Sequence, residues 1–239
     1  MSAVNRVGAS RRIACLLVAL SGCVETFDGN GVAGEEVREV ADFDSIVARG
    51  ELEVVVTEGP FAVRVTIDEN LLERIQTENN GGRLEVAAFG GNLGDILPGP
   101  HVIVSMPELR SLEFSGAGSV TATDFSESDN VSLRLSGVGN LRWSGDAPGV
   151  LAELNGSGEL TLGGTASRVT YLLNGAGTLD ATGLRARSAG IELRGPGSVS
   201  ATVDGVVDAR VEGSGTIELL GNVIEGNWVV LNDGAVNGP

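Results

Sequence analysis

The sequence predicts an all-β protein built as a single-stranded parallel β-helix, a solenoid whose coils are each about 19 residues long. Three observations predict this class. A Gly-x-Gly triplet returns six times in the second half of the 239-residue chain. Apolar and polar residues alternate on both sides of the triplets, as they do in half-buried strands. Glycine accounts for 36 residues, aromatic residues for only 4%, and lysine is absent, which is typical of a chain rich in strands and turns.

The triplets recur at nearly constant intervals, with 21, 19, 19, 20 and 18 residues between successive first glycines. The paired glycines are Gly116 and Gly118, Gly137 and Gly139, Gly156 and Gly158, Gly175 and Gly177, Gly195 and Gly197, and Gly213 and Gly215. Because glycine has no Cβ, we expect each triplet to form a sharp bend between two short strands. Pro196, in the middle of the fifth triplet, lacks a backbone N–H and therefore also fits a turn.

Apolar side chains stand in phase with the glycines, so they are expected to face the core. In the second repeat the residues in phase are Leu133, Leu135, Leu141 and Trp143, and polar residues lie between them. Tyr171 has the same inward phase. About 19 extended residues at ~3.3 Å each trace roughly 60 Å, which is enough for two or three short faces around a narrow core.

Stacking in register predicts two columns of outward residues on the strands before the triplets. The first column reads Glu113, Arg134, Glu153, Leu172, Glu192 and Arg210, and the second reads Ser115, Ser136, Asn155, Asn174, Arg194 and Glu212. The alternating charges favour this register, because opposite charges across adjacent strands contribute about 0.2–1 kcal/mol. We interpret both columns as solvated faces rather than binding sites.

The amino terminus has the layout of a secretory signal. Three arginines precede the apolar stretch 13–20, and the sequence Leu-Ser-Gly-Cys ends at Cys23. This ending resembles the bacterial lipobox, whose cysteine becomes the lipidated first residue of the mature protein. We therefore expect residues 1–22 to be removed and Cys23 to carry a lipid that holds the exported protein in the cell envelope. Val24, which is not Asp, favours the outer membrane where the cell has one.

Removal of residues 1–22 would leave 13 arginines against 32 acidic residues, a net charge of −19. Such a chain repels polyanions, so nucleic acid is excluded as a partner and the lipid would provide the membrane attachment. Cys15 leaves with the signal and Cys23 takes the lipid, so no disulfide is expected. No apolar run of 18 residues occurs, and no membrane-spanning helix is predicted.

The chain divides into four segments. They are the signal peptide 1–22, a flexible glycine-rich tether 23–36, the solenoid domain 37–231 and a polar tail 232–239. The start of the solenoid lacks the regular period. Strands are predicted there over 51–57, 61–67 and 83–88, with a short helical or turn insert over 68–75.

The two ends of the solenoid are expected to be atypical, because terminal coils must cover exposed edges and core. Ala48-Arg49-Gly50 has the phase of a degraded triplet and marks a first corner. At the far end, Asn227–Leu231 is expected to cover the last coil, with the polar tail fraying beyond it.

Several short motifs occur in a recognisable order. They are Arg38, Phe43, Ile46 and Gly50, then Asp68-x-Asn70-Leu71-Leu72, Gly82-x-Leu84, Met106-Pro107-x-Leu109-x-x-Leu112 and Ser115-Gly-Ala-Gly. In this order they resemble the bacterial putative auto-transporter adhesin, head GIN family, over about residues 37–225. The resemblance implies a secreted or lipid-anchored β-helical protein and brings no catalytic residues with it. Ala48-Arg49-Gly50 departs from the Gly-Ser-Gly that is common in the family.

The glycines do not indicate a cofactor or a metal. A dinucleotide fingerprint needs a third glycine and a following helix, whereas a strand follows each triplet here. Calcium-binding solenoids carry Asp after each Gly-x-Gly. The residues at that position are Ser119, Asn140, Glu159, Thr178, Ser198 and Thr216. The acidic residues Asp124, Glu127 and Asp129 are interpreted as solvated surface in preference to a weak divalent-cation site.

Catalytic residues are not predicted either. His101 is the single histidine, and it opens the apolar strand 102–104, where a structural role is favoured. It has no cysteine or second histidine as a companion in the mature chain, so zinc sites and Cys–His pairs are excluded. Neither a Gly-x-Ser-x-Gly elbow nor a carboxylate pair in an apolar setting stands out. We predict no catalytic, cofactor-binding or metal-binding residue and no cofactor.

Two functions remain open. The first is a non-enzymatic, lipid-anchored envelope protein that serves adhesion, polymer binding or assembly, with a surface polymer or protein as its ligand. Outward hydroxyls on the strands after the triplets offer one such surface: Ser119, Thr121, Thr123, Thr178, Thr182, Ser198, Ser200 and Thr202. The second is a polysaccharide-cleaving enzyme on a solenoid scaffold, which the acidic charge disfavours for acidic substrates.

Overall fold

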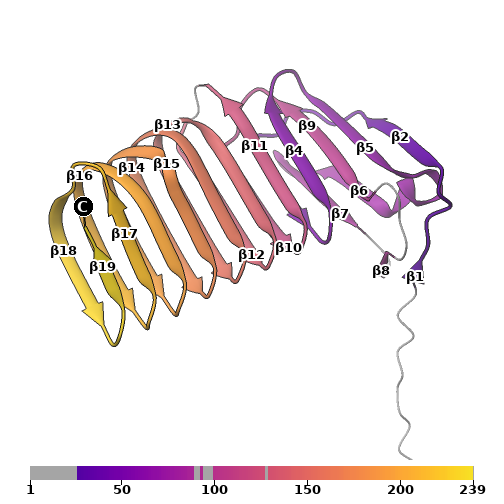
Figure 1. The fold of residues 1–239 in the computed structure, drawn as a ribbon. Coiled ribbons are helices and arrows are strands. Elements are labelled where there is room, and N and C mark those ends of the chain that lie inside the picture. Colours follow the sequence, from indigo (N-terminus) through magenta and orange to yellow (C-terminus); the bar gives the residue numbers. More distant parts are fainter. Residues whose placement is uncertain (1–25, 89–91, 94–98, 127–128, 239) are drawn as a thin grey trace, which may run out of the picture.

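The computed structural model describes residues 26–88, 92–93, 99–126 and 129–238, which form an elongated stack of strands (Figure 1). The stack has two long faces that meet along one edge at the Gly-x-Gly triplets. We call them the pre-triplet face and the post-triplet face, after the strands that precede and follow each triplet. Residues 1–22 and Cys23 lie outside the described residues, so the predicted signal and lipidation site stay predictions.

Both faces are built mostly by parallel pairing. In spatial order the pre-triplet face contains β6 (Ile75–Asn79), β7 (Arg83–Ala88), β3 (Ser45–Arg49), β10 (Ser111–Gly116), β12 (Val131–Gly137), the second halves of β13 (Asn140–Gly156), β14 (Glu159–Gly175), β15 (Thr178–Arg194) and β16 (Ser198–Glu212), and β18 (Ile224–Leu231). The post-triplet face contains β2 (Ala33–Arg38), β5 (Ala62–Asp68), β9 (His101–Met106), β4 (Glu53–Glu58), β11 (Ser119–Phe125), the first halves of β13 to β16, β17 (Thr216–Leu220) and β19 (Ala235–Asn237). A separate short pair joins β1 (Thr26–Phe27) to β8 (Asn92–Leu93). From β10 onward every pair is parallel, and the predicted β-helix with its spacing of roughly 19 residues is confirmed.

The strand register matches the predicted outward columns. Glu113 pairs with Arg134, and Arg134 pairs in turn with Glu153. The Arg134 guanidinium lies 2.9 Å from Glu153 and 3.6 Å from Glu113. One column over, the amide of Asn174 donates to Asn155 across 2.9 Å. These contacts join neighbouring coils through side chains as well as through the backbone.

The core is a thin column between the two faces. The apolar residues in phase with the glycines are buried, including the large side chains of Trp143 and Tyr171, which are 0% and 1% exposed. Burial raises the pKa of the Tyr171 phenol, so this group stays neutral. The Tyr171 hydroxyl and the Trp143 ring N–H have no hydrogen-bond partner within the described residues.

The triplet corners are too tight for a side chain at their first position. Gly156 has φ +138°, and a Cβ there would lie 2.2 Å from the carbonyl oxygen of Gly137 in the preceding coil. That same oxygen accepts hydrogen bonds from the backbone N–H groups of Ser157 and Gly158, at 2.9 and 3.1 Å. The absence of Cβ therefore permits both the turn and the hydrogen bonds between stacked corners.

The first corner lies two residues later than the sequence suggested. Arg49 pairs with Ser115, which places Gly50 beside Gly116, the first glycine of the first triplet. The corner is therefore Gly50-Glu51-Leu52, and the N–H of Ser119 donates to the Leu52 carbonyl. Ala48, expected to begin the corner, is a buried strand residue. The alternation pattern could not decide this, because a shift of two residues leaves every side chain on the same face.

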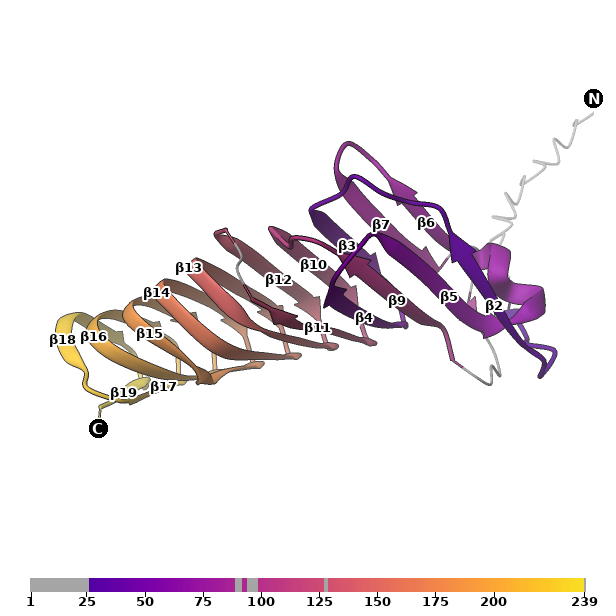
Figure 2. The same cartoon turned by 90° about the horizontal axis from the view of Figure 1, so that it is seen from above.

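At the N-terminal end the spatial order of coils differs from the chain order. The coil of β3 and β4 lies between the coil of β7 and β9 on one side and that of β10 and β11 on the other. Outside β9 lie β5 and β2, and outside β7 lies β6, all in antiparallel pairs (Figure 2). The insert expected over 68–75 is the 3-10 helix η1 (Glu69–Arg74). Within the described residues no helix has the length and apolar character needed to cross a membrane.

Two segment boundaries also differ from the expectation. Residues 33–36, assigned to the tether, form part of β2, because their backbone completes the edge of β5. Residues 235–237, assigned to the tail, form β19 beside β17. Trp228 in β18 covers the last coil as expected, and its ring N–H donates to the carbonyl of Val207 at 2.9 Å.

Candidate functional site

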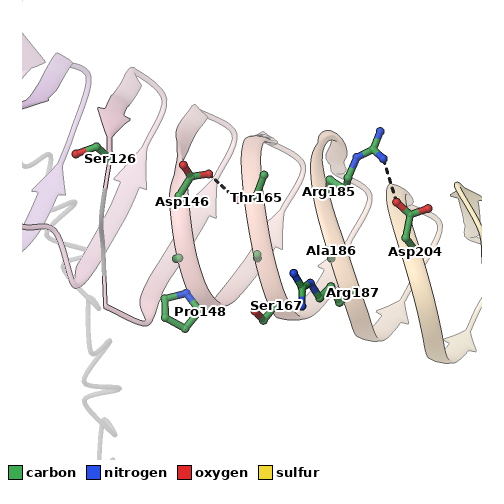
Figure 3. A pocket seen from close by; sticks show the side chains of 11 residues that line it. Ser126, Asp146, Pro148, Thr165, Ser167, Arg185, Ala186, Arg187 and Asp204 are labelled. Atoms are coloured by element: carbon green, nitrogen blue, oxygen red, sulfur yellow. Dashed lines mark hydrogen bonds and ion pairs between the residues drawn. The ribbon is translucent and has the colours of Figure 1, made fainter.

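A groove with a volume of about 760 Å³ runs across neighbouring coils at the edge opposite the triplets (Figure 3). Its walls are two rows of outward side chains. The first row contains Ser126, Asp146, Thr165 and Arg185, and the second contains Pro148, Ser167, Arg187 and Asp204, whose carboxylate turns toward Arg185. The groove therefore follows the long axis of the solenoid.

Local sequence explains why two rows form. Three neighbouring coils carry an alanine at the middle of this edge, and Ala147, Ala166 and Ala186 are paired in register and point inward, with Val203 in the same position of the next coil. The residues on either side of each alanine point outward, roughly 6.6 Å apart along the strand, because side chains alternate every ~3.3 Å. Adjacent coils repeat the pattern at about 4.8 Å. The result is a channel with polar walls that crosses these coils.

Side-chain hydrogen bonds link neighbouring coils along the groove. Thr165 Oγ1 donates to Asp146 at 2.6 Å, and Arg185 donates to Asp204 at 3.1 Å. Asp204 also accepts from the backbone and side-chain N–H groups of Asn222, at 2.9 and 3.1 Å. The Asn222 backbone N–H chiefly, with Arg185, lowers the pKa of Asp204, so this carboxylate is ionised at neutral pH.

The groove's carboxylates are poorly placed for acid–base chemistry. Asp146 and Asp204 stand three coils apart, roughly 14 Å at the usual strand spacing. Glycoside hydrolysis uses two carboxyl groups separated by roughly 5–9.5 Å, one of them with a raised pKa. The pKa of Asp204 is instead lowered. The arrangement offers hydrogen bonds and ion pairing to an extended ligand.

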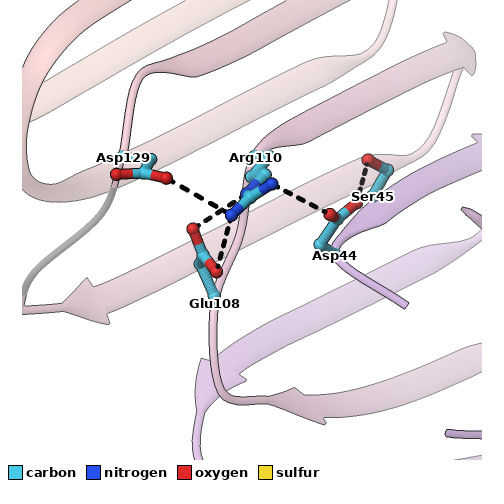
Figure 4. Close-up of polar contacts among 5 residues, drawn as sticks. All are labelled: Asp44, Ser45, Glu108, Arg110 and Asp129. Atoms are coloured by element: carbon cyan, nitrogen blue, oxygen red, sulfur yellow. Dashed lines mark hydrogen bonds and ion pairs between the residues drawn. The ribbon is translucent and has the colours of Figure 1, made fainter. Parts of the chain in front are cut away.

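A second polar cluster surrounds Arg110 at the junction with the N-terminal coils (Figure 4). Its guanidinium lies 2.9 Å from Glu108, 3.3 Å from Asp129 and 3.7 Å from Asp44. The hydrogen bond from Arg110 to Glu108 is the main cause that raises the arginine pKa. Asp129, interpreted as solvated surface, is thus half of an ion pair that ties loops of different coils together. The ion pairs of Arg110 between coils account for this cluster as a structural contact rather than a binding site.

His101 lies elsewhere, on the post-triplet face. It pairs with Glu53 and borders a shallower depression of about 600 Å³ that also involves Glu51 and Ser119. Within the described part of the chain, no group of three or more His, Cys, Asp or Glu side chains is arranged to hold a metal ion. The outward hydroxyls of Ser119, Thr178 and Ser198 share one column, with Asn140 and Glu159 between them.

Sequence reasoning missed the groove. The signal was present as a second repeat, x-Ala-x, midway between triplets: Asp146-Ala147-Pro148, Thr165-Ala166-Ser167 and Arg185-Ala186-Arg187. Its spacing equals that of the triplets, and only stacking shows that the flanking residues line one channel.

Comparison with solved structures shows the same fold. A structure described as a putative adhesin from Bacteroides fragilis NCTC 9343 is 19% identical and has a TM-score of 0.82, covering 89% of this chain and 100% of its own. A structure described as a putative lipid binding protein from Parabacteroides distasonis ATCC 8503 is 22% identical with a TM-score of 0.75, covering 90% and 100%. A putative adhesin from Parabacteroides merdae ATCC 43184 is 19% identical with a TM-score of 0.69, covering 90% and 100%.

Sequence comparison gives the family. None of the curated proteins matches the chain. The family model described as "Putative auto-transporter adhesin, head GIN domain" matches residues 42–223, which includes every triplet and all of the groove. The match spans well over half of the sequence and agrees with the resemblance seen in the motifs. The chain therefore belongs to the auto-transporter adhesin, head GIN domain family.

Proposed function

We propose that this protein is a non-enzymatic, exported adhesin that binds an extended surface polymer in the groove between Asp146 and Asp204. The observation that carries the proposal is the groove itself, a channel along the solenoid axis whose backbone pattern repeats over three neighbouring coils. An extended polymer can make weak contacts on successive coils, and such contacts add up along the chain. Membership of an adhesin family supports binding to surface ligands over catalysis.

Binding without turnover is the expected result with the purified protein. We would incubate it with a panel of cell-wall and capsular polysaccharides and measure both retention of polymer and release of shorter chains. Saturable binding with unchanged polymer length supports the proposal. Shortening of any polymer would contradict it and favour the polysaccharide-cleaving enzyme.

A pair of variants locates the binding surface. Ser167→Trp places a large ring in the middle of the groove and is expected to weaken polymer binding at least tenfold. Thr178→Trp places the same ring on the hydroxyl-rich post-triplet face and is expected to leave binding unchanged. Both residues are exposed, so neither variant should disturb folding. The reverse result would move the site to the post-triplet face.

The proposal includes a lipid on Cys23 as the membrane anchor. The lipobox-like residues before Cys23 support it, together with the basic and apolar segments ahead of them. Cys23→Ser is expected to abolish incorporation of labelled fatty acid and to release the protein into the soluble fraction. Fatty-acid labelling of the Cys23→Ser protein would contradict this assignment.

A further inference from the structure

We infer that the groove selects acidic polysaccharides, and that Arg187 binds their carboxylates; this rests on the proposed function of the groove. The inference starts from the difference between its two arginines. Arg185 is held by Asp204. Arg187 is exposed and forms no ion pair with any residue that the structure describes. Its guanidinium carries five N–H donors in a planar fork that matches a carboxylate.

The surroundings of Arg187 keep those donors available. On one side its neighbours in the second row, Ser167 and Pro148, bring no charge. On the other side the register places Asp204 and Gly205 beside Arg187, but the Asp204 carboxylate is held by Arg185 and Asn222 and forms no ion pair with Arg187. Figure 3 shows the guanidinium lying toward Ser167, on the side away from Asp204.

The acidic groups of the groove are already engaged. Asp204 accepts from Arg185 and Asn222, and Asp146 accepts from Thr165. They nonetheless keep their negative charge close to the groove, and they repel additional carboxylates. A single unpaired cation between two acids therefore fits a polymer in which neutral sugars separate the carboxylates. Ser167 can donate to sugar hydroxyls, and the Pro148 ring gives an apolar surface for a sugar face.

The acidic charge of the whole chain does not oppose this contact strongly. The formal net charge is −16, but charges beyond roughly 8 Å are largely screened at physiological ionic strength. A bidentate ion pair acts at about 2.8 Å and is screened less. We therefore expect affinity for an acidic polymer to hold or rise between low and physiological salt, unlike binding to a diffuse basic patch, which falls steeply.

The test compares the parent protein with Arg187→Gln on two defined ligands. The purified protein is titrated by calorimetry with an oligosaccharide of alternating glucuronate and N-acetylglucosamine, and with the same oligosaccharide after its carboxyl groups are reduced to alcohols. Arg187→Gln is expected to weaken binding of the acidic form about tenfold, the loss typical of one charge-assisted contact, and to leave the reduced form unchanged.

Two controls separate a local contact from general electrostatics. Arg168 follows Ser167 in the chain, is exposed, forms no ion pair with a described residue and does not line the groove. Arg83 has the same properties on distant β7. Arg168→Gln and Arg83→Gln remove the same charge as Arg187→Gln and should change affinity less than twofold. An effect of Arg168→Gln equal to that of Arg187→Gln would overturn the inference.

Other outcomes distinguish this inference from the proposed function. Equal binding of the acidic and reduced forms, with loss of both in Ser167→Trp, would preserve the groove as the polymer site and overturn its preference for carboxylates. Tighter binding of a sulfated analogue would overturn the carboxylate assignment as well. Undiminished binding of every ligand by Ser167→Trp would contradict the site and the inference together.

Discussion

The regular coils, residues 111–220, and the N-terminal cap, residues 33–106, share the same two faces but differ in how chain order relates to spatial order. In the regular coils each strand pairs with the strand one repeat later, as in the contact of Arg134 with Glu153, 19 residues away. Where the coils meet the cap, Ser126 reaches back to Glu58 of the cap, 68 residues away, and its N–H donates at 2.7 Å. Neighbours in the cap are set by the folded topology rather than by a period.

This difference between the regular coils and the cap shows which part of the structure is specified by the sequence repeat. In the regular coils, every coil offers the next one the same strand, corner and column positions, so local and long-range preferences agree. The coil of β3 and β4 in the cap supports two neighbours that come from later, unlike parts of the chain. We therefore expect the regular coils to tolerate loss of a unit and the cap not to.

Deletion of one coil from each region gives the largest expected effect. Removal of residues 157–175 joins two equivalent corners and should leave a folded protein one coil shorter, because the flanking strands can pair in the same register. Removal of residues 44–62, also 19 residues, takes away β3 and β4 and should abolish folding. Circular dichroism and size-exclusion chromatography distinguish the outcomes. A folded 44–62 deletion would show that the cap is as modular as the coils.

Substitution of two glycines by alanine distinguishes the cost of steric overlap from the cost of backbone strain. Gly156→Ala in the regular coils introduces a Cβ 2.2 Å from a backbone oxygen at φ +138°, and it should lower the free energy of unfolding by about 3 kcal/mol or more. Gly81→Ala in the cap meets nothing within 4 Å at φ +64° and should cost only about 1 kcal/mol. Urea unfolding measures both. Equal losses would mean that strain, rather than contact between stacked corners, dominates at the triplets.

The contrast between the regular coils and the cap also explains which structural features the sequence could predict. Strand phase, register and both outward columns in the regular coils follow from the triplet interval, because each residue's spatial neighbour lies one period away. The insert at 68–75 and the strand at 83–88 were also recognisable from local pattern. The position of the first corner was not, since alternation leaves Ala48-Arg49-Gly50 and Gly50-Glu51-Leu52 equivalent in phase.

The cap order and the groove needed the structure for different reasons. The sequence of residues 75–106 does not predict that β7 and β9 stack outside β3 and β4. This order depends on which pairing of strands distant in sequence buries more apolar surface. The groove is lined by residues that are far apart in the sequence and belong to common surface residue types. In the sequence Arg187 is an ordinary arginine, and only the structure shows that the neighbouring Asp204 pairs with Arg185 instead.

The smallest effect concerns the charged column of the regular coils. Asn155 donates to Glu153 at 2.6 Å and Arg134 donates at 2.9 Å, and these contacts, led by that of Asn155, hold the pKa of Glu153 below its usual value of 4.5. A lowered pKa contributes stability above about pH 4.5, and the contribution is lost as pH falls through the folded-state pKa. Glu153→Gln should therefore cost less than about 1 kcal/mol at pH 7, since the pair is partly solvated.

Unfolding curves across pH 3 to 7 check this prediction. The stabilities of Glu153→Gln and the parent protein should converge as the solution is acidified, and Asn155→Ala should move the parent profile toward that of Glu153→Gln. A constant difference across the whole range would show that Glu153 acts through packing rather than through its charge. In that case register in the regular coils would depend on the buried alternation and the glycine corners alone, and the outward column would contribute only solubility.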